Sequence, residues 1–200
     1  EWNEQLAALA DYAKGKTVEE LKTMAVGEDG KAGDVDLAAS VTLYIGSFVD
    51  GIEAAANASH MGASRGDRLG LASETSMSKS KDAADGKDGV AQAYATAAAV
   101  TFSGGTVTSC YIDAVQANVN FDASGKITTD LSAAPQTKNQ LGDGYGMKKA
   151  GSIGKEWNEQ AAAFCAYVTG KTVDEVKGLA VGEDGKAADA DLAAGVTIGI

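Results

Sequence analysis

The sequence is poor in the residues that build metal centres and nucleophilic active sites. Its 200 residues include one histidine, His60, one proline and two cysteines, Cys110 and Cys165. Two cysteines are too few for a disulfide framework or a cysteine-rich zinc site. A single disulfide between them remains an alternative at the level of the sequence. Any Ser-His-Asp or Cys-His catalytic arrangement has to use His60. We therefore predict no catalytic residues and no metal site, and we favour a non-catalytic protein over an enzyme.

Positive charge and long apolar runs are also scarce. Seventeen Lys and Arg residues stand against 28 Asp and Glu residues, which gives a net charge of −11. Nucleic acids and anionic lipids attract clustered positive charge, so this balance argues against both as partners. A membrane-spanning helix needs about 18 or more consecutive apolar residues, and no run approaches that length. With 44% apolar residues, the chain is predicted to be globular and not inserted in a membrane.

One stretch of the sequence occurs twice. Residues 1–45 align without a gap on residues 156–200, and 30 of the 45 positions are identical. An offset of about 155 residues is far longer than a solenoid repeat, so we interpret it as the tandem duplication of a whole domain. We expect the chain to be a segment of a longer protein, with the end of one unit followed by most of the next.

Each copy of the repeat predicts short helices with recognisable ends. Trp2, Leu6 and Leu9 share a helical face, and we expect Trp2 and its counterpart Trp157 to be equivalent core residues. Gly15-Lys16-Thr17 resembles part of a phosphate-binding loop, but no G-x-x-x-x-G-K-[ST] pattern is present. Thr17 followed three residues later by Glu20 instead predicts a capping box, and Asp34 predicts a helix N-cap.

The middle of the chain has the period of β-structure. Between residues 90 and 102, larger side chains alternate with a nearly continuous series of alanines, and Gly104-Gly105 predicts a hairpin turn into a return strand over 106–117. The alanine face lets a helix or a flat ligand approach closely, and we favour the helix. Residues 129–155 are predicted to be a loop.

These patterns predict an α+β fold, in which an antiparallel hairpin-based sheet packs with amphipathic helices. The predicted organisation has three parts: the helical C-terminal part of a first repeat unit at 1–58, a linker at 59–85, and a second repeat unit, truncated at its end, at 86–200.

The order of parts resembles the FMN-binding domain family of bacterial surface lipoproteins and membrane redox complexes. Asp88-Gly89 opens the hairpin, and its return strand reads Val-x-Ser-x-Tyr-x-Asp from Val107 to Asp113. The stretch 145–150 and the segment from Gly154 to Trp157 are also similar to duplicated surface lipoproteins of Gram-positive anaerobes. The resemblance implies an extracellular or cell-surface location, with any anchor outside this segment. In the flavin family a threonine can carry FMN, and the matching positions here are Thr42 and Thr197.

Two functions follow as hypotheses. The first is a non-catalytic extracellular tandem-repeat module, which binds a small-molecule ligand or neighbouring copies of the same protein, or serves a structural role. The alternative is an FMN-binding extracellular electron-transfer domain, in which the cofactor performs the chemistry. For that alternative, Trp157 and Tyr111 are candidates to flank the flavin ring, and its polar edge is assigned to Asp113, Gln116 and Asn118. The ordinary structural reading of these residues is core aromatics and a solvated strand end.

Overall fold

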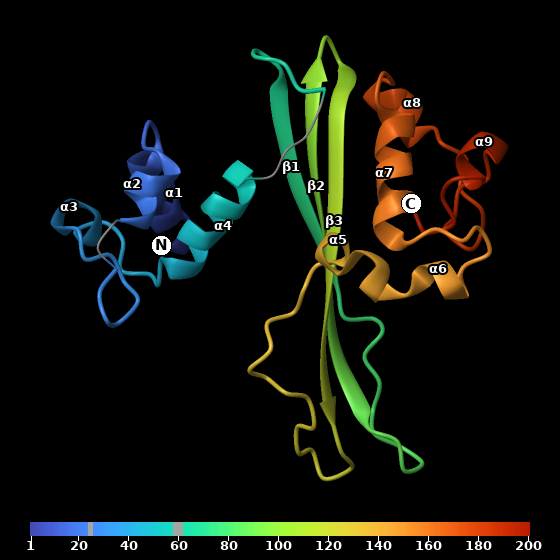
Figure 1. Cartoon of the computed structure of the whole chain (residues 1–200), viewed down its shortest axis with the longest axis horizontal. Coiled ribbons are helices and arrows are strands. Elements are labelled where there is room, and N and C mark those ends of the chain that lie inside the picture. The colour runs from blue at the N-terminus through green and yellow to red at the C-terminus, as the bar shows by residue number, and fades with distance from the viewer. Residues whose placement is uncertain (24–25, 58–61) are drawn as a thin grey trace. The chain divides into compact units, whose positions relative to one another are not determined.

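The chain divides into two compact units, Glu1–Ser59 and His60–Ile200 (Figure 1). The structure is a computed structural model that describes residues 1–23, 26–57 and 62–200. His60 lies outside the described residues, so the structure gives no geometry for the sole histidine.

Unit 1 is helical throughout its described elements, which are α1 (Trp2–Ala13), α2 (Val18–Lys22), α3 (Val35–Ala38) and α4 (Gly46–Asn57). The predicted capping box is present, because Glu20 N–H donates to Thr17 Oγ1 at 3.2 Å and Thr17 N–H donates to Glu20 Oε2 at 2.7 Å. Asp34 caps α3 by accepting a hydrogen bond from the Leu37 N–H at 3.0 Å. The helices enclose a small aliphatic core made of Leu9, Leu21, Leu37, Val41, Ile45 and Val49.

Unit 2 is built on an antiparallel sheet in the order β1–β2–β3, formed by β1 (Arg68–Ser76), β2 (Gly89–Ser103) and β3 (Thr106–Phe121). The predicted hairpin is confirmed, since Gly104 and Gly105 have φ values of +57° and +84°. In a two-residue type I′ hairpin turn both central residues need positive φ, which glycine adopts without strain. Strand β1 pairs with residues 94–102 of β2, so the rest of the β2–β3 hairpin continues beyond it as a two-stranded ribbon.

Strand β1 lies inside the segment 59–85 that the sequence predicts as a linker. Nine residues of this segment pair with β2 in register from Arg68↔Phe102 to Ser76↔Tyr94. The sequence gives little sign of the strand, because eight of its nine residues are exposed and its composition is polar. An exposed edge strand of this kind is stabilised by backbone hydrogen bonds, so its sequence does not need to alternate apolar and polar residues. The second unit therefore begins before residue 86.

Helices α7 (Trp157–Val168), α8 (Val173–Lys177) and α9 (Ala190–Ala193) follow the sheet, and α7 packs along β3 (Figure 1). The predicted loop 129–155 contains further short elements, which are α5 (Lys138–Leu141), the 3₁₀-helix η1 (Gly142–Tyr145) and α6 (Met147–Ala150). With its described helices and antiparallel sheet, the chain has the α+β fold that the sequence predicts.

Helix α7 covers a different face of the sheet from the one expected. Its contacts include Tyr94, Ile112 and Ala114, which lie on the face opposite the alanines because strand side chains alternate. On the alanine face, Ala93 and Ala97 of the central strand remain exposed. Alanines leave little apolar area to bury, whereas the larger side chains of the other face give α7 more contact.

The two copies of the repeat form matching elements, but their tryptophans lie in different environments. Trp157 is 5% exposed and packs with Ala114 of the sheet, whereas Trp2 is 59% exposed. The prediction that Trp2 and Trp157 are equivalent core residues is therefore wrong. The described part of unit 1 contains no sheet like that of unit 2, so within its own unit α1 has no counterpart of the sheet that buries Trp157.

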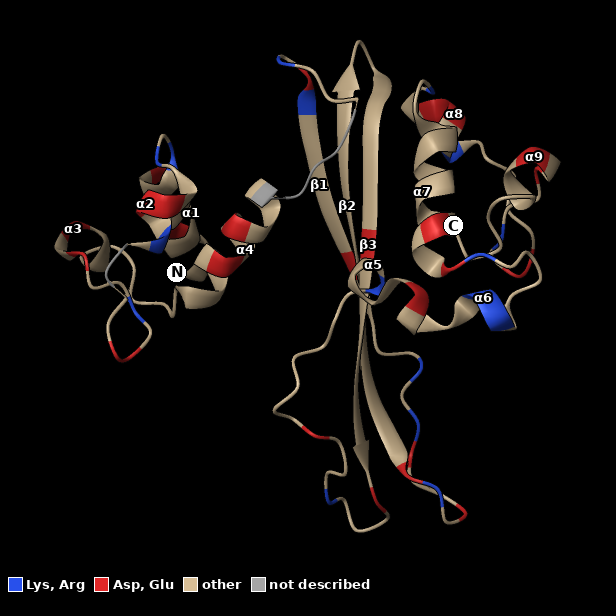
Figure 2. Ribbon diagram, in the orientation of Figure 1, with Lys and Arg blue, Asp and Glu red and all other residues tan. Residues whose placement is uncertain are grey.

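Charged residues lie mainly outside the strands (Figure 2). Strand β2 carries no charged residue, and β3 carries only Asp113. None of the described helices is both long enough and apolar enough to cross a membrane.

Candidate ligand-binding site

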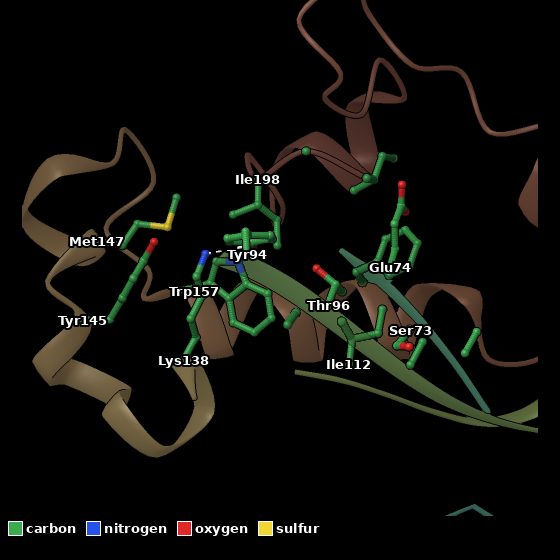
Figure 3. Close-up of a pocket in the computed structure, with 16 residues that line it drawn as sticks. Ser73, Glu74, Tyr94, Thr96, Ile112, Lys138, Tyr145, Met147, Trp157 and Ile198 are labelled. Carbon is green, nitrogen blue, oxygen red and sulfur yellow. Dashed lines mark hydrogen bonds between the residues drawn. The ribbon is translucent and has the colours of Figure 1, made fainter. Parts of the chain in front are cut away.

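A pocket of about 890 Å³ lies between helix α7 and the sheet face that it covers (Figure 3). We refer to it as the α7 pocket. All three strands, the segment from α5 to α6, helix α7 and the last residues of the chain contribute to its walls. Its lining is Ala72, Ser73, Glu74, Tyr94, Thr96, Ala98, Ile112, Lys138, Tyr145, Met147, Trp157, Ala161, Phe164, Ile198, Gly199 and Ile200.

The start of α7 is fixed by hydrogen bonds that hold Trp157 in the wall. The Glu156 N–H donates to Glu159 Oε2 at 2.7 Å, as in a capping box. The Glu156 carboxylate is buried and accepts a hydrogen bond from the Met147 N–H at 2.7 Å. This contact connects α7 to α6, so the segment carrying Tyr145 and Met147 lies against the first turn of α7.

Gln160 holds the chain around Ile198, which also lines the pocket. Its side chain is fully buried, and Oε1 accepts hydrogen bonds from the Thr197 N–H at 2.8 Å, the Thr197 hydroxyl at 3.1 Å and the Ile198 N–H at 3.2 Å. Unit 1 has the same arrangement, because Gln5 Oε1 accepts from the Thr42 N–H at 2.8 Å and the Thr42 hydroxyl at 3.1 Å. The repeated Gln and Thr therefore connect a helix to the chain that follows α3 or α9.

Lys138 is the charged side chain buried in the α7 pocket. It is 5% exposed, and its ammonium donates a hydrogen bond to the Tyr94 hydroxyl at 3.0 Å. The ammonium also lies 4.7 Å from the ring centroids of Tyr94 and Tyr145, and 5.0 Å from that of Trp157. Three ring faces at these distances attract a cation through their quadrupoles.

Sequence reasoning did not identify Lys138, because it lies in the predicted loop 129–155. A usable signal was present in Thr137 and Gln140, which have the spacing of a capping box. In the structure the Gln140 N–H donates to Thr137 Oγ1 at 3.2 Å and the Thr137 N–H donates to Gln140 Oε1 at 2.9 Å. This box starts α5 with Lys138 as its first residue.

The residues predicted to surround a flavin are only partly brought together. Trp157 lines the α7 pocket. Gln116 and Asn118 share its sheet face but line a neighbouring polar pocket, where Gln92 Nε2 donates to Asn118 Oδ1 at 3.0 Å. Tyr111 and Asp113 occupy the alternate positions of β3, and Tyr111 lines the pocket that holds the two cysteines.

Asp113, Thr197 and Thr42 also form hydrogen bonds, and these stabilise the fold. Asp113 Oδ1 accepts from the Ala114 N–H at 2.7 Å and from the Asn139 N–H at 3.2 Å, which holds α5 against β3. Thr197 is bound to Gln160 as described above, and Thr42 is bound to Gln5 in the same way in unit 1. The predicted site residues therefore do not form one cluster within unit 2.

The two cysteines lie in a further pocket of about 690 Å³ between α7 and β3. Both are free thiols, with Cys165 buried and Cys110 partly buried. A hydrogen bond with Cys165 lowers the pKa of the Cys110 thiol, and the same interaction together with burial raises the pKa of Cys165. Cys110 is therefore the thiol that ionises first. Asn158 also lines this pocket, and its Oδ1 is buried without a partner among the described residues.

Nothing in the described ranges gathers three or more His, Cys, Asp or Glu side chains in a way that can hold a metal ion. The chemistry available in the α7 pocket is therefore aromatic stacking, apolar contact, the hydroxyls of Ser73 and Thr96, and the opposite charges of Lys138 and Glu74. These groups suit binding and orientation of a ligand.

Comparison with known proteins gives a short similarity. Over 42 residues, which are 21% of this chain, the sequence is 50% identical to a chlorophenol reductase from Desulfitobacterium hafniense. The matched stretch covers 13% of the length of that reductase. No family model matches the chain, and no solved structure matches it.

Proposed function

We propose that the chain is a non-catalytic ligand-binding module of a bacterial surface protein, located outside the cell, with the α7 pocket as its binding site. The observation that carries this proposal is a pocket of about 890 Å³ with aromatic walls in unit 2. Small-molecule sites are typically concave, mostly apolar and about 300–1,000 Å³ in volume, with a few placed polar groups. The α7 pocket has these properties, and its polar groups belong to different elements of the fold.

The proposal includes a tandem duplication of the unit. Thirty of 45 aligned residues are identical, and both copies form helices with the same caps. Thr172 and Glu175 repeat the capping box of unit 1, with a Thr172 N–H to Glu175 Oε2 distance of 2.7 Å. The Gln–Thr hydrogen bonds also occur in both copies. These hydrogen bonds support one ancestral scaffold, with the sheet adding the pocket in unit 2.

Saturable binding of an uncharged aromatic probe tests this function. N-phenyl-1-naphthylamine becomes fluorescent in apolar surroundings, and we expect it to bind unit 2 with one site. Replacing Ala98, which lines the pocket, with Trp is expected to fill the pocket and weaken binding by about 10-fold or more, the equivalent of about 1.4 kcal/mol.

The matched control is Ala97→Trp, because Ala97 is the neighbouring residue on the opposite, exposed face of the sheet. Probe binding that is absent, or that is lost equally in both variants, refutes the pocket as the site. The non-catalytic part of the proposal has its own test: an enzymatic turnover that Asp113→Ala abolishes would contradict it.

An FMN-binding extracellular electron-transfer domain is the second candidate. It is favoured by the presence of Trp157 in a pocket of about 890 Å³, and by the similarity to a protein named as a reductase. When bound, the flavin would supply the electron-transfer chemistry, and Trp157 would contact its ring. Thr197, the predicted attachment residue in unit 2, precedes the pocket-lining Ile198, and its hydroxyl donates a hydrogen bond to Gln160 Oε1.

The absorption spectrum of the purified protein, recorded before and after incubation with FMN, separates the two candidates. A chain that shows no flavin band and retains no FMN is not a flavin-binding domain. Covalent attachment requires a mass increase after treatment with FAD and a flavin transferase. A mass increase that persists in the double variant Thr42→Ala/Thr197→Ala excludes these two threonines as the attachment sites.

The proposed partners include neighbouring copies of the same protein as well as a small molecule. Leu69 and Leu71 of the edge strand β1 are 70% and 77% exposed, on the same sheet face as Ala97. Exposed apolar area at a sheet edge favours association. Light scattering over a range of protein concentrations tests this prediction, and a monomer at every concentration contradicts it.

A further inference from the structure

Among the residues that the structure describes, the buried ammonium of Lys138 has no counter-ion. At 5% exposure it is among the few charged side chains that the described structure buries, and the chain as a whole has an excess of negative charge. Within residues 1–23, 26–57 and 62–200, the ion pairs shorter than 4.0 Å all involve other basic groups. Buried lysines are usually paired, because removing an ammonium from water is costly.

The surrounding groups satisfy this cation only in part. An ammonium has three N–H donors, and the described residues accept one of them, through the Tyr94 hydroxyl. The rings of Tyr94, Tyr145 and Trp157 add cation–π attraction but no negative charge. Two donors therefore remain for a group that enters the α7 pocket.

Neither Glu156 nor Glu74 acts as the counter-ion of Lys138. Glu156 is buried, but its carboxylate accepts from the Met147 N–H and forms no ion pair with Lys138. Glu74 is exposed, and Figure 3 shows it with Ser73 at the opposite side of the pocket from Lys138 and Tyr145. The pocket thus has a buried positive end, where aromatic rings surround the ammonium, and an exposed negative end.

We infer that the α7 pocket binds aromatic carboxylates, with the carboxylate of the ligand paired to the Lys138 ammonium and its ring against Trp157. This inference rests on the proposed function and specifies its ligand class. A carboxylate accepts several hydrogen bonds and supplies the missing charge, and charge-assisted hydrogen bonds are about twice as strong as neutral ones. The apolar side chains of Ile112, Ile198 and Phe164 leave room for a ring but offer no second cation.

Calorimetric titration with two matched probes, 2-naphthoate and its uncharged analogue 2-naphthamide, tests the inference. The two molecules have nearly the same shape and differ in charge. We expect the wild-type chain to bind 2-naphthoate at least about 10-fold more tightly, since a hydrogen bond to a charged group contributes more than a neutral one. Equal affinities would overturn the inference and would leave the α7 pocket as a site for neutral ligands.

The variant Lys138→Met removes the charge and retains most of the side-chain volume. Its preference for 2-naphthoate is expected to fall to about one, with 2-naphthamide still bound. The matched control Lys149→Met removes an exposed lysine of α6 and is expected to keep the wild-type preference. A preference that survives in Lys138→Met, or that disappears equally in both variants, would overturn the assignment of Lys138.

The outcomes also separate this inference from the proposed function. If N-phenyl-1-naphthylamine binds in an Ala98-dependent way and neither naphthalene derivative binds, only the ligand class is wrong. If none of the three molecules binds the wild-type chain, both proposals fail. The wild-type comparison does not depend on the folding of any variant.

Discussion

The two tryptophans are equivalent in the aligned repeat but are expected to contribute very differently to stability. Trp157 is 5% exposed and contacts Ala114 and Ala161, whereas Trp2 is 59% exposed. Truncation of a buried aromatic residue to alanine costs about 3–5 kcal/mol, because transfer free energy is lost and a cavity remains. We predict that Trp157→Ala destabilises unit 2 by about this amount. Trp2→Ala is expected to cost unit 1 less than about 1 kcal/mol, as is usual for exposed positions.

Urea denaturation read by hydrogen-exchange mass spectrometry measures the two effects separately. Peptides from β2 and β3 report on unit 2, and peptides from α1 report on unit 1. With a urea dependence of about 2 kcal/mol/M, the expected loss lowers the midpoint of unit 2 by about 1.5–2.5 M. A similar decrease for unit 1 in Trp2→Ala would refute the reasoning, because it would require Trp2 to be buried. Unchanged stability in Trp157→Ala would refute it equally.

Three further predictions concern other parts of unit 2. Hydrogen bonds from the Thr172 backbone and hydroxyl lower the pKa of Glu175 in the folded protein. The stabilisation from this carboxylate is therefore complete above the unfolded pKa of 4.5 and is lost as pH falls through the lower folded pKa. The melting temperatures of wild type and Glu175→Gln should converge in acid, and a constant difference between them would contradict this. Because Cys110 and Cys165 share a pocket and interact, mild oxidation with diamide should form a disulfide that closes a long loop and stabilises unit 2 by roughly 4 kcal/mol; an unchanged thiol count, measured with Cys165→Ala as the control, would exclude it. Gly105→Ala should destabilise the hairpin by about 1 kcal/mol because φ is +84° at this position, and thermal unfolding that shows no loss would contradict that strain.

Local features of the fold were accessible from the sequence because they depend on neighbouring residues. The capping box at Thr17 and the N-cap at Asp34 use side chains within three residues of the groups that they satisfy. The Gly104-Gly105 turn is likewise specified by its own backbone. The segment that forms strand β1 is predicted as a linker for the opposite reason, since the strand depends on pairing with β2, which follows later in the chain.

The candidate site depended on longer-range arrangements. Trp157 was identified as a site residue from the sequence, but Lys138 was not, because its burial results from α5 lying against β3 and α7. Alternation along β3 was readable in advance and separates Tyr111 and Asp113 from Gln116 and Asn118. These residues were nevertheless grouped in one predicted site because they are close in sequence.

The helices of the repeat, their caps and the turn between β2 and β3 are predictable from the amino-acid sequence, because each is stabilised by contacts between residues close along the chain. What the repeat contributes to each unit depends on its tertiary packing. The same Glu-Trp-Asn-Glu-Gln segment begins α1 and α7, yet within the described part of its own unit α7 packs on a sheet and α1 does not. The burial of Trp157, the formation of the α7 pocket and the burial of the Lys138 ammonium all follow from that packing.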